Sequence, residues 1–162
     1  MAGISTVSVG AVYFFGRIFK TENDTNKVVE QSQLALAAAI GLNGLGGLGL
    51  YKLYQLGIPY DKIMHFVVPL ILFMTGISLL KYRFSKTKKT AVIIMALLIF
   101  SGSLLWEGIE VLQDRVFGTK TAGVYGEDYE QDTILDIVSD VCGISLAVYL
   151  TLRSRKNTNE MI

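Results

Sequence analysis

The feature that most constrains this chain is a series of apolar stretches, each about as long as a bilayer is thick. We predict spanning helices at residues 33–57, 63–80, 90–113 and 133–152. A helix needs ~20 apolar residues to cross ~30 Å of hydrocarbon, and a soluble domain seldom carries several such runs. The composition agrees, since 51% of the residues are hydrophobic and 18% are charged. The sequence therefore predicts an all-α fold, an integral membrane helical bundle.

We expect the chain to form one transmembrane domain over residues 1–162, because its length allows a single domain. The segment at residues 1–20 is apolar but short, and it ends in basic residues. It is predicted either as a fifth span or as an interfacial helix. No positive residue precedes its apolar part and no A-x-A pattern follows, which argues against a cleaved secretory signal.

Lysine and arginine predict the orientation of the bundle. They gather in the link after the second predicted helix and in the tail at residues 153–162. Basic loops stay on the cytoplasmic side, so the C-terminus should be cytoplasmic and the acidic loop before residue 133 should lie outside. We expect the cell (plasma) membrane as the location. A formal net charge of +1 gives no basic excess, so a nucleic-acid partner is not expected.

Seven carboxylates and the chain's single histidine lie at or just inside the ends of three predicted helices. They are Asp61 and His65 on the second helix, Glu107, Glu110 and Asp114 on the third, and Asp132, Asp136 and Asp140 on the fourth. Ionisable residues are costly in hydrocarbon and usually face a wet cavity. Within each group the spacing of three, four, seven or eight residues keeps the side chains on one helix face. We therefore expect three polar stripes around one pocket that opens to the extracytoplasmic face.

A rise of ~1.5 Å per residue sorts these side chains by depth. The rim consists of Asp61, Asp114 and Asp132, the middle layer of His65, Glu110 and Asp136, and the floor of Glu107 and Asp140. Asp61 and Asp132 are also well placed to be helix N-caps. Lys62 could neutralise rim carboxylates, which leaves His65 as the basic group expected at depth.

The inner residues are the candidate catalytic and metal-binding set, namely His65, Glu107, Glu110, Asp136 and Asp140. Buried carboxylates without partners must bind a cation, share protons, or both. Oxygen ligands with one imidazole suit Mg²⁺, Mn²⁺ or Ca²⁺, and the histidine also permits Zn²⁺ or iron. In a metal-free alternative, His65 acts as general base beside Asp61 or Glu110. The spacing does not choose between these mechanisms.

Short motifs on the last three helices resemble those of VanZ-like membrane proteins. The run from Asp61 to Phe66 reads D-K-x-x-H-F, Trp106 and Glu107 are followed by Glu110 and Asp114, and Asp132-Thr133 is followed by Asp136, Asp140 and Gly143. The last stretch is also similar to the D-T-x-x-D segment of YjdF-type membrane proteins. The resemblance implies a small polytopic protein of the cell envelope, linked in the VanZ case to glycopeptide-antibiotic resistance.

Together these patterns favour a membrane protein that binds or acts on a lipid or cell-envelope precursor, with a divalent metal ion as the expected cofactor. The metal would bridge carboxylates and the phosphate of a head group. One alternative is a proton- or cation-coupled transporter subunit. Another is a structural subunit held by other membrane subunits. The residue pattern is compatible with an enzyme but does not require one.

Overall fold

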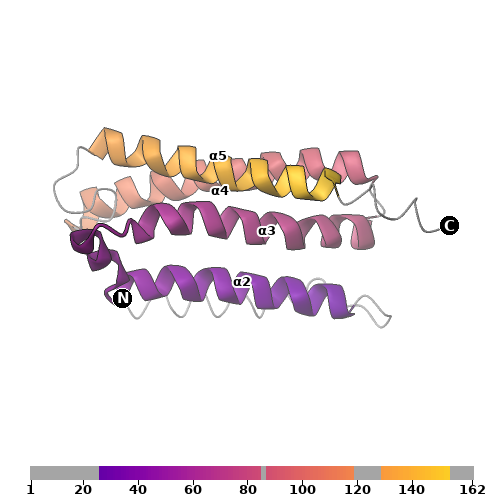
Figure 1. Cartoon of the computed structure of the whole chain (residues 1–162), viewed down its shortest axis with the longest axis horizontal. Helices are drawn as coiled ribbons and strands as arrows, with labels where there is room; N and C mark the ends of the chain where they lie inside the picture. Colours follow the sequence, from indigo (N-terminus) through magenta and orange to yellow (C-terminus); the bar gives the residue numbers. More distant parts are fainter. Residues whose placement is uncertain (1–25, 85–86, 119–128, 154–162) are drawn as a thin grey trace.

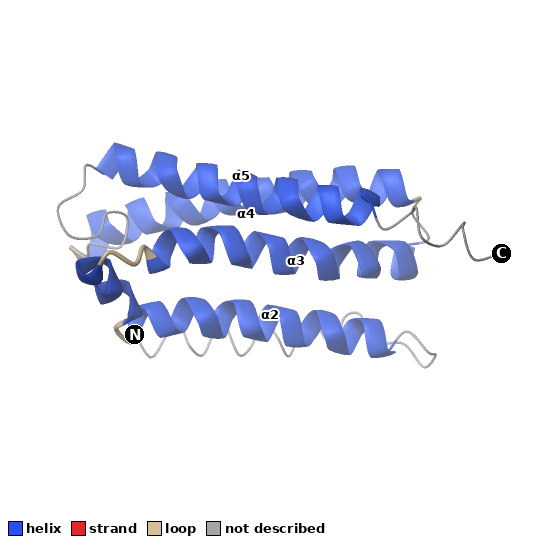
Figure 2. Cartoon of the chain, viewed as in Figure 1, coloured by secondary structure: helices blue, strands red, loops and turns tan. Residues whose placement is uncertain are grey.

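A computed structural model describes residues 26–84, 87–118 and 129–153, and these residues are helical apart from short connections (Figure 2). The elements are α2 (Asn26–Gly47), the short 3₁₀ helix η1 (Leu50–Leu56), α3 (Tyr60–Phe84), α4 (Lys88–Phe117) and α5 (Tyr129–Arg153). The predicted N-terminal helix at residues 1–20 and the tail from residue 154 lie outside the described part of the chain.

The helices form an elongated bundle in which α3 is central (Figure 1). α3 contacts α2, α4 and α5, and its most extensive packing is against α5. Successive long helices run in opposite directions, so α3 and α5 both start at the end where α4 finishes (Figure 1). This topology brings the polar ends of α3, α4 and α5 together.

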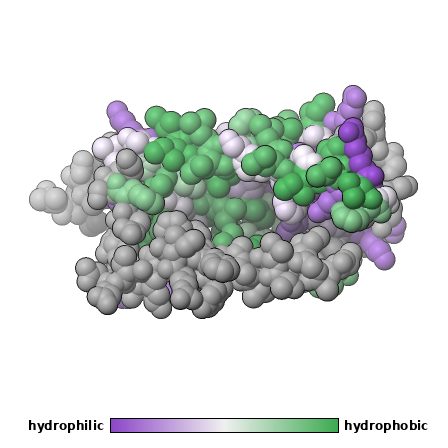
Figure 3. All heavy atoms as spheres, turned by 180° about the vertical axis from the view of Figure 1, so that it is seen from behind, coloured by the Kyte–Doolittle hydropathy of each residue, from purple (hydrophilic) through white to green (hydrophobic). Residues whose placement is uncertain are grey.

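Three of the described helices, α3, α4 and α5, are long and apolar enough to cross a membrane, and α2 with η1 makes a fourth if the bent pair is one span. Large apolar side chains face outward along these helices, among them Leu97, Leu105, Leu112 and Val138. On the back of the bundle, hydrophobic side chains cover much of the described surface and hydrophilic ones lie toward the ends (Figure 3). The predicted helical membrane bundle is confirmed.

The first predicted spanning helix, residues 33–57, corresponds to two helical segments in the structure rather than to one continuous helix. α2 ends at Gly47, η1 begins at Leu50, and the two segments are bent by 55°. Gly49 between them has a φ of 134°, which side-chain-bearing residues rarely adopt. The Tyr51 hydroxyl donates a 2.6 Å hydrogen bond to Asn43 Oδ1, which ties η1 to the end of α2. The hydropathy of the sequence predicts the apolar stretch, but it does not predict the break between α2 and η1.

The other helices begin earlier than their apolar runs. Thr87 caps α4, because its side chain accepts a hydrogen bond from the Thr90 backbone nitrogen. Asp61 and Asp132, expected as N-caps, instead lie within the first turns of α3 and α5. Both carboxylates pair with Lys62 rather than serving as caps.

The apolar core occupies the half of the bundle away from the start of α3. It consists of Phe73, Ile77, Ala91, Val92, Met95, Ile144 and Ala147, which join α3, α4 and α5. Phe73 is fully buried. The other half of the interface between these helices is polar, and the candidate site lies there.

Candidate functional site

A group of charged side chains is enclosed where α3 and α5 begin and α4 ends. We call it the charged cluster; its members are Asp61, Lys62 and His65 from α3, Glu107 from α4, and Asp132, Asp136 and Asp140 from α5. The three α5 carboxylates are each 2% exposed and Glu107 is 4% exposed. Such deep burial is unusual for carboxylates unless they have charged partners.

His65 stands between two pairs of carboxylates. Its Nδ1 atom is 3.3 Å from Asp140 Oδ2 and 3.8 Å from Glu107 Oε1. Its Nε2 atom is 3.9 Å from Asp61 Oδ1 and 3.8 Å from Asp136 Oδ1. Each ring nitrogen therefore lies near carboxylates from two different helices, and the imidazole connects α3, α4 and α5.

Lys62 is the second basic group of the cluster. Its Nζ contacts the Asp132 carboxylate, lies 2.8 Å from Asp136 Oδ1 and 3.4 Å from Asp61 Oδ2, and donates to the Asp132 carbonyl at 3.4 Å. The predicted pairing of Lys62 with rim carboxylates is confirmed for Asp61 and Asp132. Lys62 also reaches Asp136 of the middle layer, so the expectation that His65 is the single basic group at that depth is wrong. A lysine stem is long enough to carry its ammonium inward, and the i, i+3 spacing to His65 puts both on one helix face. This spacing in the sequence could have indicated that Lys62 belongs to the same cluster as His65.

A close approach of two backbones brings these side chains within reach. A Cβ atom built on Gly143 of α5 would lie 2.2 Å from the carbonyl oxygen of Phe66 on α3. Phe66 follows His65 directly, and Gly143 is three residues beyond Asp140. Only glycine permits this contact, so the missing side chain at position 143 sets the distance between His65 and the α5 carboxylates.

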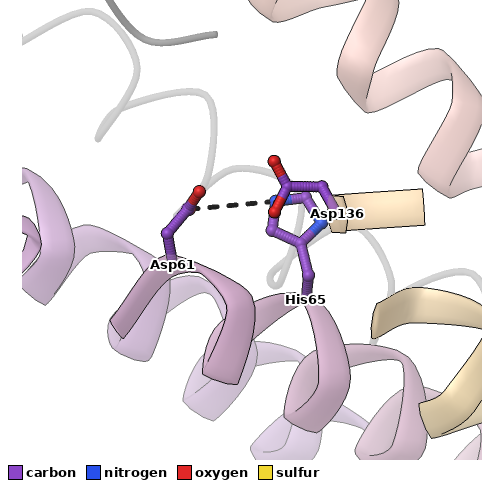
Figure 4. A group of neighbouring side chains, drawn as sticks. All are labelled: Asp61, His65 and Asp136. Carbon is purple, nitrogen blue, oxygen red and sulfur yellow. Dashed lines mark ion pairs between the residues drawn. The ribbon is translucent and has the colours of Figure 1, made fainter. Parts of the chain in front are cut away.

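Three cluster residues offer ligand atoms that lie within 4.8 Å of one another: Asp61, His65 and Asp136 (Figure 4). In Figure 4, Asp61 and His65 rise from α3 toward the Asp136 carboxylate. His65 and Asp136 belong to the predicted metal-binding set, whereas Asp61 was assigned to the rim. Glu107 and Asp140 approach the imidazole from its Nδ1 side. Glu110 and Asp114 are half-buried further along α4, and their predicted roles stay predictions.

Glu107 is a buried carboxylate whose oxygens lack hydrogen-bond partners among the described residues. Its near charged neighbour is the His65 ring at 3.8 Å. The other cluster carboxylates also depend on Lys62 and His65 for positive charge. Negative groups therefore outnumber positive ones, which is costly in a low-dielectric interior unless a cation or protons compensate.

Apolar spanning helices around a buried charged cluster define an integral membrane protein of the helical-bundle class. The family described as predicted membrane protein (DUF2238) matches residues 4–157, so the chain belongs to that family. No curated protein and no solved structure matches the chain significantly. The family match includes every member of the charged cluster and confirms that this is a membrane protein.

Proposed function

We propose that this protein binds a divalent cation in the charged cluster and uses it to hold the phosphorylated head group of a lipid or cell-envelope precursor. The VanZ-like resemblance of the motifs around His65 and Asp136 supports an envelope role. A bound divalent ion bridges carboxylate and phosphate oxygens and neutralises phosphate charge. That chemistry serves recognition of the head group and would also serve a reaction on it.

The single observation that carries the proposal is the grouping of Asp61, His65 and Asp136, whose ligand atoms lie within 4.8 Å of one another. Ligands of one divalent ion are separated by roughly 3–5 Å, given metal–oxygen distances of ~2.0–2.6 Å. Two carboxylates with one imidazole suit Mn²⁺, Mg²⁺, Zn²⁺ or Fe²⁺. The buried charge imbalance gives the ion a favourable place to bind.

The cluster is proposed to face the extracytoplasmic side. Lys88 and Lys89 begin α4 and Arg153 ends α5, at the opposite end of the bundle from the cluster. Positive residues remain in the cytoplasm, so the cluster would lie in the outer half of the plasma membrane. Asp61 and Lys62 have the most exposed side chains of the cluster, at 20% and 18%, so a ligand would arrive from that end.

A Mn²⁺ titration tests the cation site. The protein is purified in mild detergent, stripped with a chelator and titrated while free Mn²⁺ is followed by electron paramagnetic resonance. We expect His65→Ala and Asp136→Asn to weaken binding by at least about tenfold. Glu130→Gln, an exposed carboxylate at the start of α5, is the matched control and should bind like wild type. Wild-type protein that binds no divalent ion would end the proposal.

The head-group step needs a separate measurement. Calorimetry with short-chain phosphatidic acid, in the presence and absence of Mn²⁺, should show binding that depends on the metal. Short-chain phosphatidylcholine is the control lipid, because its phosphate is shielded by a choline group. Equal binding of phosphatidic acid with and without Mn²⁺ would contradict the head-group proposal and leave the cation site standing.

The position of His65 favours one second candidate, a proton- or cation-coupled transporter subunit. The ring has carboxylates at both nitrogens, which is the arrangement of a relay through an imidazole. Transport predicts a flux in reconstituted liposomes that Asp140→Asn abolishes. Cation-dependent head-group binding without any flux would reject this candidate.

A further inference from the structure

One carboxylate oxygen faces both basic groups of the charged cluster. Asp136 Oδ1 is 2.8 Å from Lys62 Nζ and 3.8 Å from His65 Nε2. It belongs to a residue of the three-ligand group, so the lysine ammonium lies directly beside the proposed cation position. An ion and the ammonium group therefore need the same carboxylate.

The imidazole has one nitrogen directed to the ion position. His65 Nδ1 is within hydrogen-bond distance of Asp140 Oδ2, at 3.3 Å. Metal-binding histidines commonly donate their second ring nitrogen to a carboxylate, which orients the ring. Nε2 is then left for the ion, on the side of Asp61 and Asp136. Asp140 is thus a positioning residue in this geometry.

Glu107, on the Nδ1 side of the imidazole, gives independent evidence that the charged cluster lacks positive charge. Its carboxylate is 4% exposed, is directed at His65, and has no hydrogen-bond partner in residues 26–84, 87–118 and 129–153. A buried carboxylate of this kind is destabilising unless positive charge is close by. Lys62 is paired with three other carboxylates, so it does not fill this need.

We propose that Lys62 is a tethered cation that bridges Asp132 and Asp136 when no ion is bound, and that it gives up Asp136 and keeps Asp132 when a divalent ion enters. The inference rests on the proposed cation site and adds a competitor to it. An ion bound to Asp136 Oδ1 would repel an ammonium that is 2.8 Å from the same atom. The ammonium must then leave Asp136.

Asp132 is ready to receive the displaced ammonium. It precedes Asp136 by four residues, so it lies ~6 Å nearer the start of α5. Its carboxylate and its carbonyl oxygen both contact Lys62 Nζ already. The movement therefore requires only that the lysine stem swings toward the more exposed end of the cluster. There the freed ammonium can contact an anionic head group held by the ion.

A double-mutant cycle of Lys62→Gln and Asp132→Asn, with Mn²⁺ as the only added ligand, tests the competition between the lysine and the ion. Lys62→Gln should tighten Mn²⁺ binding by about tenfold or more, because a competing positive charge is removed. Arg115→Gln removes an exposed positive charge at the same end of α4 and should change affinity by less than about twofold, since exposed charges are screened.

The same cycle tests the role of Asp132. Asp132→Asn should weaken Mn²⁺ binding in the wild type, because the displaced lysine loses its second position. The weakening should be clearly smaller in the Lys62→Gln background, and that coupling isolates the lysine. Equal effects in both backgrounds, or a Lys62→Gln variant that binds no more tightly than wild type, would overturn the inference.

A labelling experiment on wild-type protein needs no variant. Acylation of lysines is followed by peptide mass spectrometry with and without saturating Mn²⁺. Lys62 should become several-fold more reactive with Mn²⁺, while Lys52, exposed on η1, stays constant. Mn²⁺ binding with unchanged Lys62 reactivity would refute the lysine movement but keep the cation site, whereas absence of Mn²⁺ binding would refute both proposals.

Discussion

Replacing Gly143 by alanine tests whether one missing side chain holds α3 and α5 together beside the charged cluster. The new Cβ would lie 2.2 Å from the Phe66 carbonyl oxygen and 3.1 Å from its carbonyl carbon. A backbone oxygen cannot turn away as a flexible side chain can. The two helices would therefore have to separate at this turn.

The size of the effect follows from these distances. Relieving the contact needs a separation of ~1 Å, and overpacking of this kind costs about 1–3 kcal/mol. Alanine favours a helix over glycine by ~1 kcal/mol, which offsets part of that cost. The same separation would lengthen the His65 Nδ1 to Asp140 Oδ2 distance of 3.3 Å beyond hydrogen-bond range. Gly143→Ala should therefore lose both stability and Mn²⁺ affinity.

Unfolding by sodium dodecyl sulfate from mixed micelles, followed by circular dichroism, measures the stability change. Two glycines provide graded controls. A Cβ at Gly102 of α4 meets nothing within 4 Å among the described atoms, so Gly102→Ala should be neutral or slightly stabilising. A Cβ at Gly76 would meet the flexible end of Met95 at 2.4 Å, so Gly76→Ala should fall between the two.

The order of the three variants is the critical result. If Gly143→Ala is as stable as Gly102→Ala and binds Mn²⁺ with wild-type affinity, the close approach of α3 and α5 does not set the geometry of the cluster. A loss of stability with unchanged Mn²⁺ affinity would show that the contact matters for packing alone.

Three further changes test other parts of the structure by the same unfolding assay. Phe73→Ala should destabilise by about 3 kcal/mol because it empties the center of the apolar core, whereas Phe117→Ala, at a residue 75% exposed, should have little effect. Tyr51→Phe should cost about 1 kcal/mol by removing the hydrogen bond to Asn43, and a wild-type value would show that η1 is held by other contacts. Lys62→Gln should lower the free energy of unfolding by roughly 3 kcal/mol without metal, because it leaves buried carboxylates unpaired. Saturating Mn²⁺ should restore most of that stability. A loss of stability that Mn²⁺ leaves unchanged would contradict this explanation.

Much of the bundle and part of the cluster could be predicted from local sequence patterns. Apolar length predicts the spanning helices, since crossing hydrocarbon requires a minimum number of residues. Helical periodicity predicts that Asp132, Asp136 and Asp140 share a face and that Asp61 and His65 share another. In the structure these two faces meet at His65.

The helix break at Gly49 and the choice between N-cap and ion pair for Asp61 and Asp132 could not be predicted from local sequence patterns. The break at Gly49 depends on a positive φ, which hydropathy does not encode. The N-cap assignments of Asp61 and Asp132 were wrong because both carboxylates pair with Lys62, which comes from across the helix interface in the case of Asp132.

The sequence by itself determined that the chain spans a membrane and which faces of three helices are polar, because both properties depend only on residue type and spacing. The tertiary structure decided which charges meet. The contact of Lys62 with Asp136, and the position of His65 between two pairs of carboxylates, depend on how closely and in which rotation α3 packs on α5. That packing is controlled by the backbone contact at Gly143 and by the apolar core at the other half of the bundle.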